Sequence, residues 1–341
     1  MPTGGPKPPA IEVHEAGTIG HGHAMIVLLT RRIFGLILTL LAVSLLIFAV
    51  MALLPGDPAA ITLGTSATPE TLAALRHEMG LDQPLIIRYG QWLAGALTGD
   101  LGKSYTYGVP VAGLIVERLA VTLPLAALAI LLSVLIAVPL GVAAAAKRGG
   151  VFDIVAAMFS QMGIAVPGFW LGQLLVLWFA ISLGWMPAIG FSGWHSGLLP
   201  ALKSLVLPTI ALALPQAAVL TRVTRSAVLD MLHEDFSRTA VAKGLSRSRV
   251  LWGHVVPNAL VPVLTILGLQ FTFLVAGAVL IENAFALPGL GRLAYQALSQ
   301  RDVIVLQDVV LFFAGLVIVV NFLVDLSYLA IDPRLRAGGA R

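Results

Sequence analysis

Long apolar runs alternate with short polar segments along this chain, and six of the runs are long enough to cross a membrane. They cover about residues 33–54, 119–146, 154–183, 202–220, 256–281 and 309–331. A spanning helix needs roughly 20 apolar residues to cross about 30 Å of hydrocarbon. The runs are continuous rather than alternating, which argues against spanning strands. We therefore expect an all-α polytopic membrane protein with six transmembrane helices.

Composition agrees with a membrane protein. The 341 residues are 58% hydrophobic and 11% charged, with a mean hydropathy of +0.94, whereas soluble domains carry about 25% charged residues. The chain has no cysteine, which excludes disulfides and thiolate metal sites. The first apolar run is too long for a signal-peptide core and lacks a small-residue cleavage site, so we expect an uncleaved anchor.

The basic residues predict the orientation. Fourteen of the 21 lysines and arginines lie before the first run, between runs two and three, between runs four and five, or after the sixth. The positive-inside rule places these segments, and hence both termini, in the cytoplasm. We expect a flexible cytoplasmic tail (1–30), a first transmembrane helix (31–54), an extracytoplasmic helical insertion (55–118), a transmembrane core (119–336), which includes the 221–257 segment, and a C-terminal tail (337–341).

The outer segment 55–118 is too long for a plain connector. Thr68, followed by Pro and Glu, is typical of a helix start, and Gly80 can end that helix. Tyr89 and Trp92 lie at helical spacing after Pro84. We expect a small helical subdomain packed on the outer face. The alternative for the two aromatic residues is an interfacial helix anchored in the membrane surface.

A basic segment, residues 221–257, separates the fourth and fifth runs. Arg238–Lys243 is a plausible short helix that Gly244 would end in the left-handed conformation, and Ser246 can cap a second helix leading into the fifth run. Ala240 and Gly244 are small and four residues apart, so they would form a smooth patch that another surface can approach. The alternative is a helix that lies on anionic lipid.

This segment resembles the cytoplasmic coupling loop, Glu-Ala-Ala…Gly, of ATP-binding-cassette importer permeases. Here the first three positions are Arg238-Thr239-Ala240, so the Glu is absent, but Gly244 and Pro257 are present. The run from Arg238 through Leu245, with His254 after it, is similar to the dipeptide/oligopeptide permease branch. Further passages that resemble this branch are Leu54–Pro58, Gly80–Pro84, Gly99–Ser104, Pro167–Trp170, Pro288–Arg292 and Asp332–Arg334.

The resemblance implies one of two membrane subunits, usually paired with a related but different permease. Two separate ATPase subunits would bind ATP, so no cofactor is expected in this chain. An extracytoplasmic binding protein would deliver the peptide, and no nucleic acid is expected as a partner. The resemblance leaves open dipeptides, oligopeptides, nickel chelates, glutathione or opine-like cargo. The residues that would dock the ATPase are Arg238, Thr239, Ala240, Lys243, Gly244 and Pro257.

Ionisable groups at membrane depth are candidates for the substrate path. Glu282 and Asn283 close the fifth run, and Asp325 lies in the sixth. Asp325 could instead pair with a neighbouring helix or mark the inner interface. Prolines that can kink the spans are Pro124, Pro139, Pro167, Pro208, Pro215 and Pro262.

Two other function classes stay open. A self-contained secondary transporter or channel should show paired intramembrane charges or an inverted repeat, and neither is clear. An intramembrane hydrolase could use Ser192 with His195, but both fall in an outer loop. The segment Gly99–Ser104 resembles the end of a phosphate-binding loop, yet Leu97 stands where that motif needs Gly. His14, His21 and His23 could bind a metal ion, but they lie in a Gly- and Pro-rich tail that we expect to be disordered and without function.

Overall fold

The computed structural model describes residues 19–53 and 57–331 as a set of helices. In order they are α1 (Ile19–Leu53), α2 (Pro58–Leu63), η1 (Gly64–Ser66), α3 (Pro69–Glu78), α4 (Leu85–Thr98), α5 (Val111–Ala146), α6 (Val151–Ala165), α7 (Gly168–Leu175), η2 (Val176–Ser182), η3 (Trp194–Ser196), α8 (Leu198–His233), α9 (Asp235–Ala242), α10 (Arg247–Val250), η4 (Leu251–Val255), α11 (Val256–Ala284), α12 (Leu290–Gln300) and α13 (Val303–Ile331). Within those ranges the β-type pairing is one isolated bridge between Lys103 and Pro110. The expected all-α fold class is confirmed.

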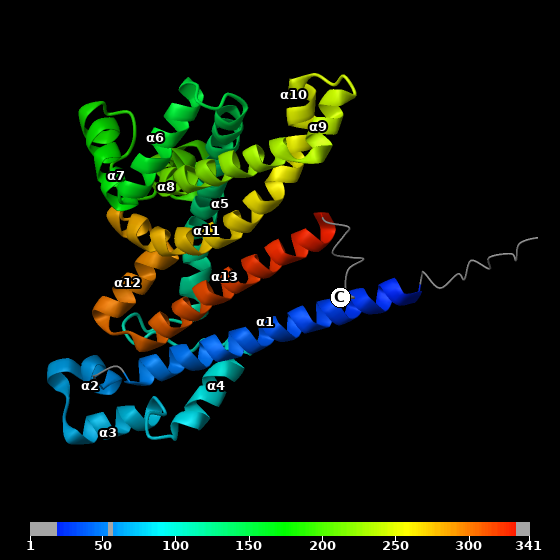
Figure 1. The fold of residues 1–341 in the computed structure, drawn as a ribbon. Helices are drawn as coiled ribbons and strands as arrows, with labels where there is room; N and C mark the ends of the chain where they lie inside the picture. Colours follow the sequence, from blue (N-terminus) through cyan, green and yellow to red (C-terminus); the bar gives the residue numbers. More distant parts are fainter. Residues whose placement is uncertain (1–18, 54–56, 332–341) are drawn as a thin grey trace, which may run out of the picture.

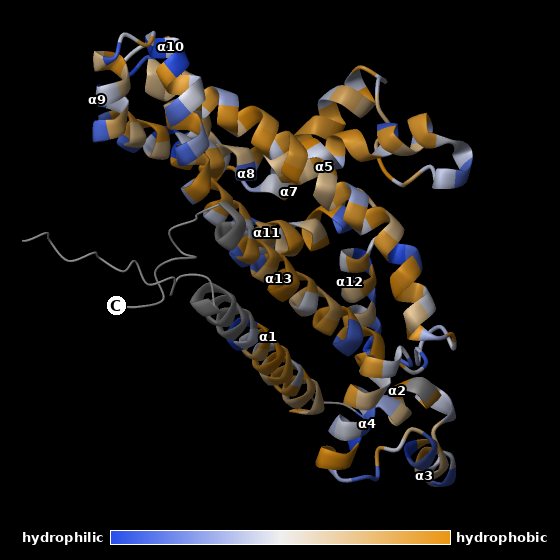
Figure 2. Ribbon diagram, turned by 90° about the vertical axis from the view of Figure 1, so that its right-hand side faces the viewer, coloured by the Kyte–Doolittle hydropathy of each residue, from blue (hydrophilic) through white to orange (hydrophobic). Residues whose placement is uncertain are grey.

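Five helical segments are long and apolar enough to cross a membrane, and they are Thr30–Leu53, Val111–Ala146, Leu198–His233, Arg247–Ala284 and Val303–Ser327. A sixth candidate is a broken pair, Val151–Ala165 with Gly168–Ser182, which bends by 101°. Figure 1 shows the insertion helices α2–α4 at one end of the molecule and α9–α10 at the other. Figure 2 shows apolar residues along most of the long helices, as a lipid-facing surface requires.

The predicted span over 154–183 is a bent pair of helices, and it breaks at one of the six prolines expected to be able to kink a span. The chain is extended at Val166, with φ −93° and ψ 120°, between α6 and α7. Pro167 explains the break, because proline has no N–H to donate and disfavours helical geometry in the residue before it. The other five candidate prolines stand inside helices that run on past them in α5, α8 and α11.

Several boundaries also differ from the expected ones. α1 begins at Ile19, so part of the predicted flexible tail, including His21 and His23, is helical. α5 begins at Val111 and α8 runs on to His233, because charged residues at the ends of a span lower its hydropathy without breaking the helix. His14 and the passage Asp332–Arg334 lie outside the described residues.

The core is built by α5, α8 and α11. Leu125, Leu205 and Leu274, one from each helix, belong to a single buried apolar cluster. The helices approach closely where residues are small. A Cβ added at Gly141 of α5 would lie 2.7 Å from the Thr224 Cβ of α8. Such contacts fix the position of α8, the helix that leads to the 221–257 segment.

Within the predicted insertion, the helix expected to begin after Thr68 forms as α3, although α2 and η1 precede it. Thr68 caps α3 in a reciprocal capping box with Thr71, and Gly80 follows with φ +66°. The aromatic residues of α4 face the protein rather than the membrane surface. Trp92 donates its indole N–H to Asp308 of α13 at 2.7 Å, and its ring lies near Phe48 of α1. The insertion is therefore held by α1 and α13.

Candidate functional site

The 221–257 segment forms the helix–glycine–helix element that the sequence predicts. The first thirteen of its residues complete α8, and Glu234 then breaks the helix with an extended backbone before α9 begins at Asp235. Gly244 has φ +87°, a left-handed conformation that favours glycine. Ser246 caps α10 by accepting the backbone N–H of Arg249 at 3.4 Å. The long helix α8 is thus followed by a short exposed helix, α9, and a tight turn at Gly244.

One face of α9 is turned inward. Ser237 and Ala240 are buried, and Ala240 packs in an apolar cluster with Val228 and Val250. The predicted smooth outer patch of Ala240 with Gly244 is therefore wrong, because Ala240 lies three residues from Ser237 on the inward face. The exposed residues of α9 include Phe236 and Val241, whose exposed fractions are 40% and 49%.

The remaining predicted docking residues lie on the outside of the element. Arg238, Thr239 and Lys243 are exposed, and Arg238 has only a loose contact, 3.8 Å, with the exposed Asp235. A Cβ at Gly244 would meet no atom within 4 Å. Pro257 is exposed in the first turn of α11. Apart from Ala240, these residues leave their side chains or surfaces free for a partner.

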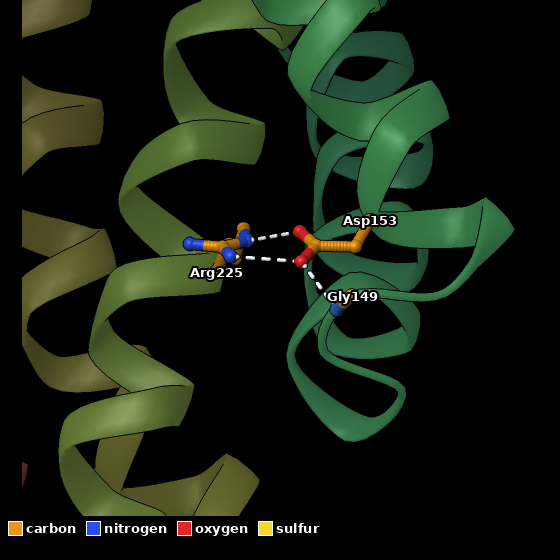
Figure 3. Close-up of polar contacts among 3 residues, drawn as sticks. All are labelled: Gly149, Asp153 and Arg225. Carbon is orange, nitrogen blue, oxygen red and sulfur yellow. Dashed lines mark hydrogen bonds and ion pairs between the residues drawn. The ribbon is translucent and has the colours of Figure 1, made fainter.

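An ion pair that the sequence did not reveal fastens α8 to the α5–α6 turn (Figure 3). The Arg225 guanidinium of α8 donates from Nε and Nη2 to the two carboxylate oxygens of Asp153 in α6, the second bond at 3.0 Å. The backbone N–H of Gly149 also donates to Asp153, at 2.8 Å. The partners are 72 residues apart, and each alone resembles an ordinary charge at a helix end.

Glu282, a predicted substrate-path residue, is fully buried. It accepts the Thr122 hydroxyl at 2.6 Å and the N–H groups of Gly291 and Arg292 at 2.7 and 3.1 Å. Thr122 in turn accepts the Leu290 N–H at 2.8 Å. Glu282 of α11 and Thr122 of α5 therefore cap the N-terminus of α12 together.

The other two path candidates have separate partners. Asp325 pairs with Arg32 of α1 at 3.1 Å, and Asn283 donates its side-chain amide to Val279 at 2.8 Å. The structure thus gives Glu282, Asn283 and Asp325 intramolecular partners and joins none of them to another. Their assignment to a substrate path stays a prediction.

The alternative sites gain no support from the geometry. Ser192 and His195 share no hydrogen bond within the described residues, and Ser192 contacts Ser204 through its backbone N–H at 3.5 Å. Ser104, at the end of the loop-like Gly99–Ser104 passage, donates its buried hydroxyl to Asp302 at 2.5 Å. Among the described residues no group of three or more His, Asp or Glu side chains could hold a metal ion.

Comparison with known proteins covers most of the chain. Residues 137–337 match the family described as the binding-protein-dependent transport system inner membrane component, and residues 25–126 match the N-terminal family of such membrane components. A putative peptide transport system permease of Brucella abortus is 44% identical over 92% of this chain and 99% of its own. A probable peptide ABC transporter permease of Sinorhizobium fredii is 41% identical over 91% and 99%. A glutathione transport system permease of Salmonella choleraesuis is 40% identical over 90% and 97%.

A solved structure shows the same fold at lower identity. An inward-facing MetNI methionine ABC transporter aligns with a TM-score of 0.52 and 20% identity, over 64% of this chain and 96% of the other. At that identity the likeness concerns the fold alone. The family match and the full-length relatives agree, and the chain therefore belongs to the family of inner membrane components of binding-protein-dependent transport systems.

Proposed function

We propose that this chain is one permease subunit of an ATP-driven importer that takes up peptides. An extracytoplasmic binding protein delivers the peptide, two separate ABC ATPase subunits bind and hydrolyse ATP, and a second, related permease completes the pathway. The chain itself is non-catalytic. The observation that carries this proposal is the α9–Gly244–α10 element, whose exposed face stands at the end of the continuous helix α8.

The packing suggests how the ATPases would drive the spans. A single residue, Glu234, separates α9 from α8, and α8 packs against α5, α6 and α11. A displacement of α9 would therefore be transmitted along α8. Arg225 lies eight residues before the end of α8, about two helical turns, and its bond to Asp153 makes the α5–α6 turn follow. Binding that favours one arrangement of α9 would shift the spans between inward-open and outward-open states.

Peptides are the cargo class that the relatives favour. The Brucella and Sinorhizobium proteins carry the name of peptide permeases, and the Salmonella relative that of a glutathione permease; glutathione is itself a tripeptide. Uptake of labelled dipeptides, longer peptides and glutathione into cells with and without this chain tests the cargo. A cargo that is not a peptide would contradict this part of the proposal.

The orientation follows from the basic segments. We place both termini and the 221–257 segment in the cytoplasm and the insertion α2–α4 outside, because the former carry most of the basic residues. The opposite placement of α9–α10 and α2–α4 supports this assignment (Figure 1). Labelling single cysteines introduced at Lys243 and Thr98 from either side of intact cells tests it. Labelling of Lys243→Cys from outside would overturn the assignment.

The central test is co-purification of the chain with its ATPase. Gly244→Arg strains a turn with φ +87° and adds a long side chain at the α9–α10 junction, so we expect the ATPase to be lost. Gly99→Arg is the matched control, because Gly99 also has a positive φ, +84°, and open space, but lies in the insertion. A wild-type chain that purifies without any ATPase, while a control importer stays intact, would favour a self-contained transporter.

A further inference from the structure

A cavity of about 640 Å³ lies beside the α9–α10 element. Its lining comes from the ends of α5 and α8, from α9 and α10, from Lys147 just after α5, and from Leu251 at the start of η4. The floor is apolar and includes Leu232, Val241 and Leu251. Two parts of the chain that are far apart in sequence, the start of the α5–α6 turn and the 221–257 segment, thus build one cavity.

The charged residues that line this cavity are all cationic, namely Lys147, Arg238 and Arg247. No acidic side chain of the described chain lines it, although Glu234 and Asp235 are close in sequence. Within the same ranges Lys147 and Arg247 form no ion pair, and Arg238 has only its 3.8 Å contact with Asp235. The Lys147 ammonium lies over the Phe152 ring, 5.4 Å from its centroid. The cavity therefore has an excess of positive charge and free N–H donors.

We infer that this cavity, which we call the cationic cavity (Lys147, Arg238 and Arg247 over an apolar floor), receives an acidic side chain of the ATPase subunit. The inference rests on the proposed function and specifies its chemistry. A carboxylate on an aliphatic stem fits both parts of the cavity, because its stem covers the apolar floor and its oxygens accept from the arginines. Arginine is well suited to this role, since its planar guanidinium pairs with a carboxylate through two parallel hydrogen bonds.

The cationic cavity adjoins the exposed face of α9. This favours an acidic side chain of the ATPase as its occupant over the headgroup of an acidic phospholipid. Arg238 and Val241 belong both to the cationic cavity and to the exposed residues of α9. A protein that binds the exposed residues of α9 would therefore also contact residues that line the cavity. Such a contact would make the ATPase hold the end of α5 as well as α9, so that both cytoplasmic segments move with it.

The test measures the affinity of the purified ATPase for the permease complex in nanodiscs of neutral phosphatidylcholine. We expect Arg247→Glu and Lys147→Glu each to weaken binding by about tenfold to a hundredfold, as loss of a charge-assisted bond implies. Arg249→Glu and Arg148→Glu are the matched controls, because each makes the same charge change one or two residues away and neither residue lines the cavity. We expect the controls to change affinity by less than about threefold, which corresponds to under 1 kcal/mol.

Two results would overturn the inference. Equal affinity for Arg247→Glu, Lys147→Glu and their controls would exclude a cavity contact with the ATPase. Unchanged affinity in neutral lipid, together with a loss of the response to added phosphatidylglycerol in the cavity variants alone, would assign the cavity to lipid. If the reversed charge prevents folding, Arg247→Gln replaces Arg247→Glu in the test, because it removes the positive charge without adding a negative one. A wild type that binds no ATPase at all would instead refute the proposed function itself.

Discussion

Replacing Glu282 with alanine should destabilise the C-terminal end of α11 more than its position near a helix end suggests. The Glu282 carboxylate accepts the N–H groups of Gly291 and Arg292 in a site that excludes solvent. Each buried donor left without a partner costs about 1–3 kcal/mol. The carboxylate no longer has to be desolvated in the variant, which offsets part of that cost. We therefore expect a net loss of about 2–4 kcal/mol in the free energy of unfolding.

Glutamine at the same position separates hydrogen bonding from charge. Its amide oxygen can accept both N–H groups, and its amide nitrogen can donate to Thr122, so we expect a loss of only about 1 kcal/mol. Thermal unfolding of the solubilised chain, followed by tryptophan fluorescence, measures both variants. Glu234→Ala is the control, because Glu234 is exposed and its side chain makes no capping bond. The reasoning is refuted if Glu282→Ala matches Glu234→Ala in Tm, or if glutamine is as damaging as alanine.

Three further predictions concern contacts elsewhere in the chain. Asp153→Ala removes the partner of Arg225. Because the two side chains are only 13% and 31% exposed, we expect a loss of about 1–3 kcal/mol, between that of an exposed and a buried pair. The double variant Asp153→Arg/Arg225→Asp should recover part of the Tm, and a double variant below both singles would contradict a direct ion pair. Gly141→Ala places a Cβ 2.7 Å from a Thr224 carbon and should cost about 1–3 kcal/mol by overpacking. Gly113→Ala in the same helix meets open space and should be neutral or stabilising by up to about 1 kcal/mol. Equal Tm values for the two variants would exclude the close contact. Thr68→Ala breaks the capping box of α3 and should cost about 1 kcal/mol. The loss should be visible as faster hydrogen exchange in the first turn of α3. An unchanged exchange rate would show that the cap contributes nothing.

Local signals predicted the features that depend on neighbours in the sequence. Thr68 at the start of α3 and Gly244 after α9 could be recognised because a cap and a left-handed turn each require only a few adjacent residues. The apolar runs likewise predicted the long helices. Pro167 was one of six prolines expected to be able to kink a span, but most of them, such as Pro124, stand inside unbroken helices, and the sequence does not say which one will break its helix.

Features that depend on residues far apart in the sequence could not be predicted from local sequence signals. Ala240 was predicted to face a partner, but its orientation depends on Val228 and Val250, which pack against it from α8 and α10. The bonds of Glu282 to Thr122 and of Arg225 to Asp153 cross 160 and 72 residues. Hydropathy records how apolar a helix is, and it carries no information about which helix lies beside it.

The insertion depends on the neighbouring helices for its stability. α3 and α4 contain no fully buried residue, and α4 is held by bonds to its neighbours, such as those from Trp92 to Asp308 and between Tyr89 and Ser44. A segment without a core of its own gains its stability from the helices that it covers. It is therefore an unsuitable unit for excision or transplantation, since its removal would leave the Asp308 carboxylate facing an emptied contact. In a native-state exchange experiment the amides of these two helices should exchange before those of the bundle beneath them.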